Sequence, residues 1–512
     1  MSEQTILGLE LGSTRIKATA IDGRYQPVSS GDYTWKSSFE NGIWTYGLDD
    51  VWTGLKAAIS GVAHRERIAA MGVSAMMHGY LAFDANGELL VPFRTWRNTI
   101  TGAAAEELTA AFGFNIPQRW SIAHLYQAML NKEEHLSKLD FFTTLAGYVH
   151  WQLTGHKVLG VGDASGMFPI DSTTGGYDAA MLQKFNTMAA AKGYAVDLNA
   201  LLPEVLPAGA DAGTLTEAGA RLLDPAGNLQ AGIPLCPPEG DAGTGMAATN
   251  SVAPRTGNVS AGTSIFAMVV LEKALSKVYP EIDMVTTPAG DPVAMVHCNN
   301  CTSDLNAWVE LLAQNAELCG AKVNKGELFT KLFNLSLQGA PDCGGVIPVN
   351  YYSGEGVTHF DAGRPMLLRG PESDFSLANL MRANIYSAFA TLAIGLDILN
   401  EEHVALDTLL GHGGLFKTPG VAQRYLAAAA HTAVTCTETA GEGGPYGMAL
   451  LAAYRVEHAD GETLASYLQN RVFAGAASTT LSPDAADEAG FAAFLKEYKK
   501  ALCAERTAVE TM

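Results

Sequence analysis

Two short strand-turn-strand segments, roughly half a chain apart, constrain the fold more than any other feature of this sequence. Residues 6–21 predict a strand, the turn Gly12-Ser13-Thr14 and a returning strand, and residues 258–270 repeat this plan around Gly262-Thr263-Ser264. Such turns expose backbone N–H groups beside small side chains, which makes them candidate anion nests. The repetition indicates an internal duplication. Two such hairpins facing one cleft would hold a nucleoside triphosphate.

A single candidate base, Asp241, precedes the second hairpin. It follows the apolar run 233–235 and a turn through Pro237 and Pro238, and small residues dominate the next seven positions. A carboxylate at the mouth of a closely packed helix could take a proton from a substrate hydroxyl. Taken alone, Asp241 is also explained as a helix N-cap, which is a common role for Asp. The neighbouring hairpin favours the catalytic interpretation.

Length and charge restrict the class of protein. A chain of 512 residues is too long for one hydrophobic core and predicts two domains of about 250 residues each. The net charge of −20 argues against a nucleic-acid or anionic-membrane partner, because both bind clustered Lys and Arg. No apolar run is long enough to span a bilayer, and the start of the chain lacks a charged leader, so we expect a cytoplasmic protein.

The cysteine pattern predicts no structural metal site. The seven cysteines are scattered from Cys236 onward, and Cys298-Asn299-Asn300-Cys301 is the one C-x-x-C segment. A structural zinc site would need a second pair of ligands at matching spacing. We therefore expect buried or cleft-lining thiols at Cys298 and Cys301.

Three polar segments of the first half are candidate sugar contacts. Met77 and His78 follow a predicted buried strand, Trp96 and Asn98 lie in the loop 93–101, and Asp163 lies in a predicted loop of small residues. An indole can cover the apolar face of a sugar while amides and acids bind its hydroxyls. A core histidine, a surface loop with one anchoring Trp, and a simple turn explain the same residues and stay open.

Periodicity predicts several further elements. A glycine-rich loop, 409–419, follows a short strand and would let an adenine ring approach bare backbone. The loop does not match a P-loop, because Phe416 precedes Lys417. A polar, Ala-rich tail closes the chain. The predicted helical segments are 49–63, 137–154, 304–316, 379–400, 421–430 and 448–454.

The ordered motifs LGLELGSTRIKA, MMHG, DASG, GDAGTG, SAGTS, YYSGEG and GHGG, with the Trp loop and the last small-residue helix, resemble the FGGY carbohydrate kinases. That family belongs to the actin/hexokinase-like ATPases. The resemblance covers nearly the whole chain. It implies an α/β fold of two similar ribonuclease H-like domains, 1–245 and 246–512, each a mixed sheet flanked by helices, with the active-site cleft between them.

The resemblance also implies ATP-dependent phosphoryl transfer with Mg²⁺. Asp241 would be the general base, and Glu10 and Asp241 would bind Mg²⁺ through water. Glu10 departs from the family pattern, in which most relatives have Asp at this position. The implied nucleotide-binding residues are Gly12, Ser13, Thr14, Lys17, Gly262, Thr263, Ser264, Gly413 and Gly414.

For the sugar, Met77, His78 and Asp163 resemble xylulokinases most. The Trp96 loop reads W-R-N where xylulokinases tend to have W-N-D, and Asn98 would replace the missing carboxylate. A pentulose such as D-xylulose is the expected substrate. L-ribulokinase, another ketose or polyol kinase, and a non-catalytic sugar- and nucleotide-binding regulator are the alternatives, and a homodimer is left open.

Overall fold

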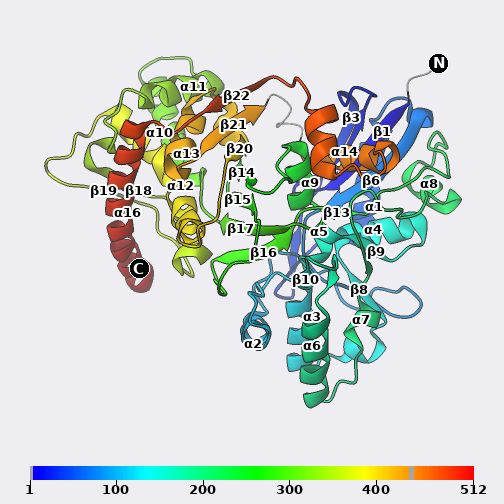
Figure 1. Ribbon diagram of the computed structural model, residues 1–512. Helices are drawn as coiled ribbons and strands as arrows, with labels where there is room; N and C mark the ends of the chain where they lie inside the picture. The colour runs from blue at the N-terminus through cyan, green and yellow to red at the C-terminus, as the bar shows by residue number, and fades with distance from the viewer. Residues whose placement is uncertain (1–3, 438–442) are drawn as a thin grey trace. The chain divides into compact units, whose positions relative to one another are not determined.

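The computed structural model describes residues 4–437 and 443–512 (Figure 1). The chain forms two compact units. Unit 1 comprises Met1–Ala253, Met284–Val293 and Glu442–Gly475, and unit 2 comprises Pro254–Asp283, Ala294–Gly441 and Ala476–Met512. This division is not the same as the predicted consecutive domains, 1–245 and 246–512, which stay a prediction. Within the described ranges, no helix is both long and apolar enough to cross a membrane.

Unit 1 is built on a five-stranded sheet with the strand order β13-β6-β1-β2-β3. β1 pairs antiparallel with β2 and parallel with β6, and β13 pairs parallel with β6. The sheet is therefore mixed, with the first hairpin at its centre. Its strands are β1 (Thr5–Leu11), β2 (Arg15–Ile21), β3 (Pro27–Thr34), β6 (Ile68–Ala75) and β13 (Glu239–Gly240).

Different helices cover the two faces of this sheet. Leu7 and Leu9 of β1 share a hydrophobic cluster with Val51 and Leu55 of α1 (Leu48–Ser60). On the opposite face, α14 (Gly444–Glu457) packs so closely that a β-carbon at Gly8 would overlap the backbone of its first turn. Figure 1 shows α14 beside β1 and β6. Because successive side chains alternate across a strand, β1 is buried on both faces.

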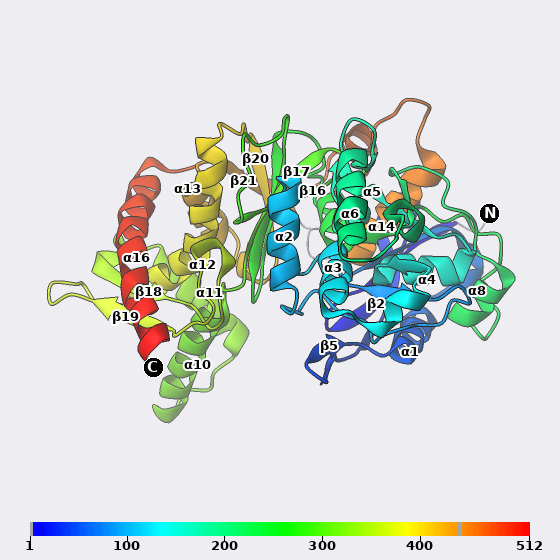
Figure 2. The ribbon, with the colours of Figure 1, turned by 90° about the horizontal axis from the view of Figure 1, so that it is seen from below.

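The remaining elements of unit 1 are short strands and helices. α2 packs against α3 and α6 (Figure 2). The helices are α2 (Gly102–Phe112), α3 (Ser121–Asn131), α4 (Leu145–Thr154), α5 (Val161–Ala164), α6 (Ala179–Ala191), α7 (Leu198–Leu201), α8 (Glu217–Leu223), α9 (Asp241–Ala248) and α15 (Leu464–Tyr467). The short strands are β4 (Ser38–Glu40), β5 (Ile43–Thr45), β7 (Leu81–Phe83), β8 (Phe141–Thr143), β9 (Val158–Gly160), β10 (Ile170–Asp171), β11 (Gly176–Tyr177) and β12 (Glu204–Leu206).

Unit 2 contains a seven-stranded sheet with the order β16-β17-β15-β14-β20-β21-β22. Part of β16 and the first residues of β17 fall in the segment grouped with unit 1. The strands are β14 (Thr256–Ala261), β15 (Ile265–Val270), β16 (Ile282–Thr286), β17 (Pro292–Cys298), β20 (Thr408–His412), β21 (Ala433–Thr437) and β22 (Ser478–Leu481), with a separate pair of β18 (Val346–Val349) and β19 (Met366–Arg369). The helices are α10 (Ser303–Leu318), α11 (Lys325–Ser336), α12 (Leu377–Glu401), α13 (Val421–Ala430) and α16 (Ala485–Thr511).

The pairing of the two sheets confirms the predicted duplication. β14 pairs antiparallel with β15 across the second hairpin and parallel with β20, as β1 pairs with β2 and β6. One position further out, the pairing is again parallel in both sheets: β21 pairs with β20, as β13 pairs with β6. The predicted α/β class with two similar mixed sheets flanked by helices is therefore confirmed.

Two local predictions were wrong, and the tail has more structure than its composition indicates. The predicted helical segment 137–154 is interrupted by the strand β8, and Thr144 then caps α4 by accepting the Gly147 N–H at 3.2 Å. The predicted loop around Asp163 forms the short helix α5. The closing tail is the helix α16, which buries Phe491, Phe494 and Tyr498 although most of its residues are polar or Ala.

Candidate active site

Asp241 is the first residue of α9 and comes directly after β13. Its Oδ1 accepts a hydrogen bond from the Met77 N–H at 3.1 Å. Gly240 occupies the N-cap position, so the interpretation of Asp241 as the helix N-cap is wrong. The surrounding protein raises the pKa of Asp241, an effect that outweighs the hydrogen bonds it accepts from backbone N–H groups, although solvent still reaches the residue. A carboxylate in this setting can accept a proton from a bound hydroxyl.

Glu10 and Lys17 lie beside Asp241 on the first hairpin. Lys17 Nζ is 3.6 Å from Glu10 Oε2. Burial raises the pKa of Glu10, Lys17 lowers it, and the negative charge of Asp241 raises it further. The longer side chain at position 10 has room because Gly444 of α14 lies against it, and a β-carbon there would overlap Glu10 Oε1. The departure from Asp is thus matched by a glycine on the facing helix.

Aromatic side chains hold the turn of the first hairpin. The Trp35 indole N–H donates to the Gly12 carbonyl oxygen at 2.7 Å, and the Tyr46 hydroxyl donates to the Ser13 carbonyl oxygen at 2.7 Å. The Trp96 indole N–H lies 3.3 Å from Ser13 Oγ. The predicted sugar loop and the predicted phosphate hairpin therefore share one hydrogen bond within unit 1.

His78 adopts a left-handed backbone conformation, with φ of 70°, and is almost fully buried. Its Nδ1 is 3.1 Å from the Gly166 carbonyl oxygen, which the Nδ1–H tautomer satisfies. The ring stacks on Trp120, with centroids 6.1 Å apart. Met77 packs its side chain against Gly240, next to the candidate base. The structure thus places Met77 beside Asp241, and the neighbouring His78 against Gly166 and Trp120.

Asp163 is fully buried on α5. Its Oδ2 accepts a hydrogen bond from Thr144 Oγ1 at 2.6 Å, and its Oδ1 has no partner within the protein. Burial raises the pKa of Asp163, and the Asp241 charge adds to that rise. A β-carbon at Gly240 would lie 3.2 Å from Asp163 Oδ1, so this oxygen is directed toward the residue that precedes the candidate base.

Asn98, the second predicted sugar contact of the loop 93–101, anchors its own loop. Its Oδ1 accepts the Trp44 N–H at 2.8 Å, and its Nδ2 donates to the Trp44 and Thr95 carbonyl oxygens at 2.8 and 3.0 Å. The residue is 2% exposed. Both ends of the amide are therefore engaged by the backbone, and a sugar contact at Asn98 stays a prediction.

Glu239 is a buried acid that the motif analysis missed. Its Oε1 and Oε2 accept the N–H groups of Gly162 and Asp163 at 3.2 and 2.9 Å. β-Carbons at Gly160 or Gly162 would overlap this carboxylate, so both positions require glycine. Burial and the Asp163 charge raise the pKa of Glu239. The signal in the sequence was a second acid two residues before Asp241, on a strand end.

Unit 2 carries the second hairpin and the glycine-rich loop. The Gly262 N–H closes the turn by donating to the Ser264 carbonyl oxygen at 2.9 Å. Gly413 has a φ of 100°, and a β-carbon there would overlap the Ala261 carbonyl oxygen at the end of β14. Gly414 has open space around it. The structure thus brings Gly413 against the strand that leads into the hairpin, and leaves Gly414 free to meet a ligand.

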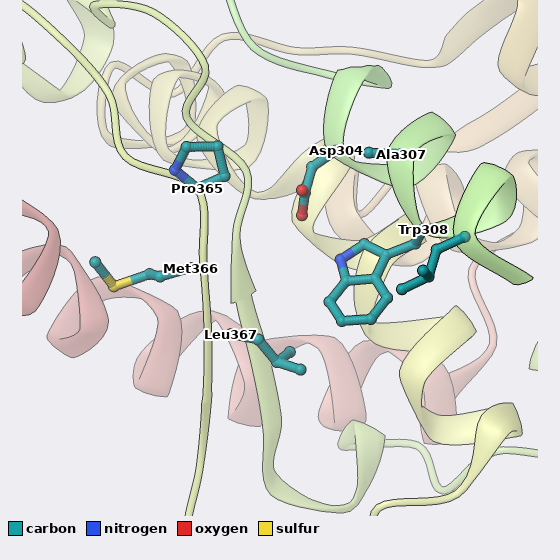
Figure 3. A pocket seen from close by; sticks show the side chains of 7 residues that line it. Asp304, Ala307, Trp308, Pro365, Met366 and Leu367 are labelled. Atoms are coloured by element: carbon teal, nitrogen blue, oxygen red, sulfur yellow. The ribbon is translucent and has the colours of Figure 1, made fainter.

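A cavity of about 180 Å³ in unit 2 lies between α10 and the segment 365–367 (Figure 3). Asp304, Trp308 and Leu311 line it from the helix, and Met366 and Leu367 line it from the facing strand. Burial raises the pKa of Asp304 to about 6, although hydrogen bonds from the Trp308 and Tyr352 side chains lower it. The cavity therefore combines an apolar wall, an indole and one acid.

Cys298 and Cys301 are free, buried thiols, as predicted. Burial raises the pKa of both well above the ordinary thiol value. Across residues 4–437 and 443–512, no three or more His, Cys, Asp or Glu side chains come together as a metal-binding group.

Two curated relatives illustrate the range of similar sequences. L-fuculokinase of Salmonella typhi is 26% identical over 269 residues, which is 47% of this chain and 51% of that protein. Xylulose kinase of Staphylococcus xylosus is 19% identical over 464 residues, 88% of this chain and 90% of that protein. The chain therefore spans only about half of the fuculokinase but most of the xylulose kinase.

Solved structures share the fold at low sequence identity. Xylulose kinase from Rhodospirillum rubrum superposes with a TM-score of 0.80 at 17% identity, covering 99% of this chain and 100% of that one. Gluconate kinase from Lactobacillus acidophilus gives 0.79 at 15% identity, covering 98% of each chain. Glycerol kinase from Plasmodium falciparum, solved with ADP, gives 0.76 at 15% identity and also covers 98% of each.

Domain profiles identify the family. The N-terminal domain of the FGGY family of carbohydrate kinases matches residues 5–245, and its C-terminal domain matches residues 257–456. The two matches follow each other in the order of the two duplicated sheets and include both hairpins and Asp241. The chain belongs to the FGGY family of carbohydrate kinases.

Proposed function

We propose that the protein uses ATP to phosphorylate a hydroxyl of a ketose, and that this ketose is a pentulose such as D-xylulose. The observation that carries this proposal is the placement of Asp241. The residue is reached by solvent, its carboxylate is oriented by the Met77 N–H, and it lies close enough to Glu10, the partner of Lys17 on the first hairpin, to raise the pKa of that acid. A phosphoryl transferase needs one positioned base and a neutralised phosphate chain, and this cluster offers groups for both.

Asp241 acts in this proposal as the general base. It accepts the proton of the sugar hydroxyl while that oxygen attacks the γ-phosphorus of ATP, and ADP leaves. A pKa raised above the ordinary Asp value improves a carboxylate as a proton acceptor, provided that it stays ionised at the working pH. The Met77 N–H orients the carboxylate by donating a hydrogen bond to Oδ1.

Glu10 of the first hairpin and Asp241 of α9 fit a magnesium ion. The negative charge of Asp241 raises the pKa of Glu10, and Lys17 pairs with Glu10, so a divalent cation would relieve the remaining repulsion between the two acids. Mg²⁺ is commonly held by one or two carboxylates together with waters and substrate phosphates. When bound, it would neutralise phosphate charge during transfer. We propose Glu10 and Asp241 as its protein partners, through water.

For the nucleotide, we propose Gly12, Ser13, Thr14 and Lys17 in unit 1, and Gly262, Thr263, Ser264, Gly413 and Gly414 in unit 2. The cavity at α10 is our candidate for the nucleoside. Thr302, just before α10, donates its hydroxyl to the Gly262 carbonyl oxygen at 2.7 Å. At a helical rise of 1.5 Å per residue, Trp308 lies about 9 Å from Thr302 along the axis of α10. Trp308 could stack on a base, and Asp304 could accept a ribose hydroxyl.

For the sugar, we propose contacts from Met77, His78, Trp96 and Asp163. An unpartnered buried carboxylate oxygen costs free energy, which a substrate hydroxyl at Asp163 Oδ1 would remove. The names of similar proteins, two of them xylulose kinases, support a pentulose. A kinase for L-ribulose or for another ketose or polyol is the second candidate. A non-catalytic regulator is disfavoured by the intact Asp241 cluster.

A substrate panel tests the proposal. ADP release would be measured with Mg-ATP and D-xylulose, L-xylulose, D-ribulose, L-ribulose, erythrulose, common hexuloses and glycerol. We expect a strong response to one pentulose. Silence across the panel by a protein that binds ADP would remove the ketose kinase assignment.

The variant Asp241→Asn tests the base. Turnover should fall by roughly 10²–10⁴, the usual contribution of a positioned base, while sugar and ADP binding stay near wild type. Unchanged turnover would remove Asp241 from the catalytic role.

A further inference from the structure

Asn300 is a buried residue of unit 2 to which the proposed function assigns no role. It lies between Cys298 and Cys301 in the loop that joins β17 to α10, and it is 3% exposed. A buried amide must find hydrogen-bond partners or destabilise the fold. Its partners therefore show what the loop is for.

The carboxamide of Asn300 ties two loops together. Its Oδ1 accepts the N–H groups of Tyr352 and Ser353 at 2.8 and 3.1 Å. Its Nδ2 donates to Glu355 Oε2 at 3.0 Å and to the Ser353 carbonyl oxygen at 3.2 Å. The backbone N–H of Asn300 donates to the same Glu355 Oε2 at 3.2 Å. One side chain thus fixes the loop 351–356 against its own loop.

The residues that follow Asn300 hold the second hairpin. The Cys301 N–H donates to the Thr263 carbonyl oxygen at 3.0 Å. The N–H and the hydroxyl of Thr302 donate to the Gly262 carbonyl oxygen at 3.2 and 2.7 Å. The turn of this hairpin consists of small residues, which cannot anchor it by packing. The loop that contains Asn300 therefore contributes three hydrogen bonds to the position of this turn.

Glu355 is the fixed end of this arrangement. It is 1% exposed, its Oε2 accepts both bonds from Asn300, and its Oε1 has no partner within the protein. A buried acid with one free oxygen is costly, so its retention beside Asn300 needs an explanation beyond packing. Holding Asn300 in one orientation supplies that explanation.

We propose that Asn300 is a positioning residue for nucleotide binding: anchored on Glu355 and the loop 351–356, it holds the loop that fixes the second hairpin. This inference rests on the proposed function, because it assumes that the hairpin contacts ATP. Loss of the anchor would let Gly262–Ser264 shift and would weaken the binding of ATP and ADP. The sugar contacts belong to unit 1 and would keep their affinity.

The variant Asn300→Asp removes the amide donor and sets a second carboxylate against Glu355 and the Ser353 carbonyl oxygen. We expect KM for ATP and Kd for ADP to rise tenfold or more, kcat at saturating ATP to stay within about threefold, and sugar affinity to stay unchanged. The matched control is Asn299→Asp. Asn299 is exposed and makes one side-chain hydrogen bond, to the Gly354 carbonyl oxygen, so we expect less than a threefold change.

A compensating pair separates positioning from general destabilisation. The double variant Asn300→Asp with Glu355→Gln restores an amide opposite a carboxylate with the roles reversed, and it should recover at least part of the ADP affinity. Thr302→Val is the second test if Asn300→Asp does not fold. It removes one bond to the Gly262 carbonyl oxygen, keeps the N–H bond, and should also raise KM for ATP selectively.

Three outcomes would overturn the inference. Wild-type ADP affinity in Asn300→Asp and Thr302→Val would overturn it while leaving the kinase assignment in place. Equal losses of sugar and ADP affinity would show a general structural role. A wild-type protein that binds no ADP in the presence of Mg²⁺ would overturn both this inference and the proposed function.

Discussion

Replacement of Glu355 by Gln should change how the stability of unit 2 depends on pH. Burial raises the pKa of Glu355 from 4.5 to about 7, an effect larger than the lowering caused by its hydrogen bonds from Asn300. At 1.36 kcal/mol per pKa unit, ionising Glu355 in the folded state costs about 3 kcal/mol more than in the unfolded chain. The stability difference between wild type and Glu355→Gln should therefore change by about 3 kcal/mol between low and high pH.

The direction follows from proton binding. Between pH 4.5 and 7 the folded state keeps the Glu355 proton while the unfolded state has released it, so the free energy of unfolding falls as pH rises through this window. The stabilising effect is complete below pH 4.5 and lost above pH 7. Gln cannot titrate. Any constant cost of burying its amide at the unpartnered Oε1 position cancels when the same two proteins are compared at two pH values.

Scanning calorimetry at pH 4.5 and 8.5 is the suitable assay, because separate units can give separate transitions. For a domain of 150–250 residues, about 3 kcal/mol corresponds to roughly 6–12 °C in Tm. The Tm of Glu355→Gln relative to wild type should rise by that amount between the two pH values. Glu372→Gln makes the same chemical change at an exposed position and should show no such trend. Parallel Tm profiles for wild type and Glu355→Gln would refute the reasoning.

Three further predictions concern single sites. Glu10→Gln should raise the Mg²⁺ concentration for half-maximal rate about 10–100-fold, as for groups that orient a metal, and an unchanged Mg²⁺ dependence would exclude Glu10 from that role. Glu239→Gln removes one of the two carboxylate oxygens that accept the N–H groups of Gly162 and Asp163, so KM for the sugar should rise several-fold in rate assays while ADP affinity stays unchanged. A selective loss of ADP affinity would contradict the placement of Glu239 at the sugar site. Gly413→Ala should destabilise unit 2 by about 2–5 kcal/mol in denaturant titrations, because its φ is left-handed and the new methyl group would overlap the backbone at the end of β14. Gly414→Ala, where there is open space, should be nearly neutral. Similar effects at both positions would contradict the packing argument.

The parts of the fold that the sequence predicts are those with a local signature. Both hairpins combine alternating strands with a turn of small residues, and the helices 304–316 and 421–430 have clear helical spacing, so α10 and α13 match the expectation closely. The placement of Met77 and His78 at a strand end was also readable, because the strand before them is continuous and apolar.

The failures come from short or contact-dependent elements. β8 has three residues and α5 has four, so neither shows a period, and only their partners determine them. Asn98 is of a residue type that binds sugars, but its amide bonds to the backbone of Trp44 on β5, 54 positions away in the sequence, and no local pattern indicates that pairing. Glu239 was hidden for the same reason, since its partners lie on α5.

The small residues near Asp241 show how a correct pattern can have two explanations. In the sequence they predict close approach by either a ligand or another backbone. In the structure α9 packs against α14, where a β-carbon at Gly447 would overlap the Thr244 carbonyl oxygen and one at Gly444 would overlap Glu10. Close packing of α14 therefore explains much of the glycine content, and it also makes room for the longer acid at position 10. The glycines and Glu10 are best understood as one feature, because an alanine at Gly444 would leave no space for the glutamate that we expect to bind magnesium.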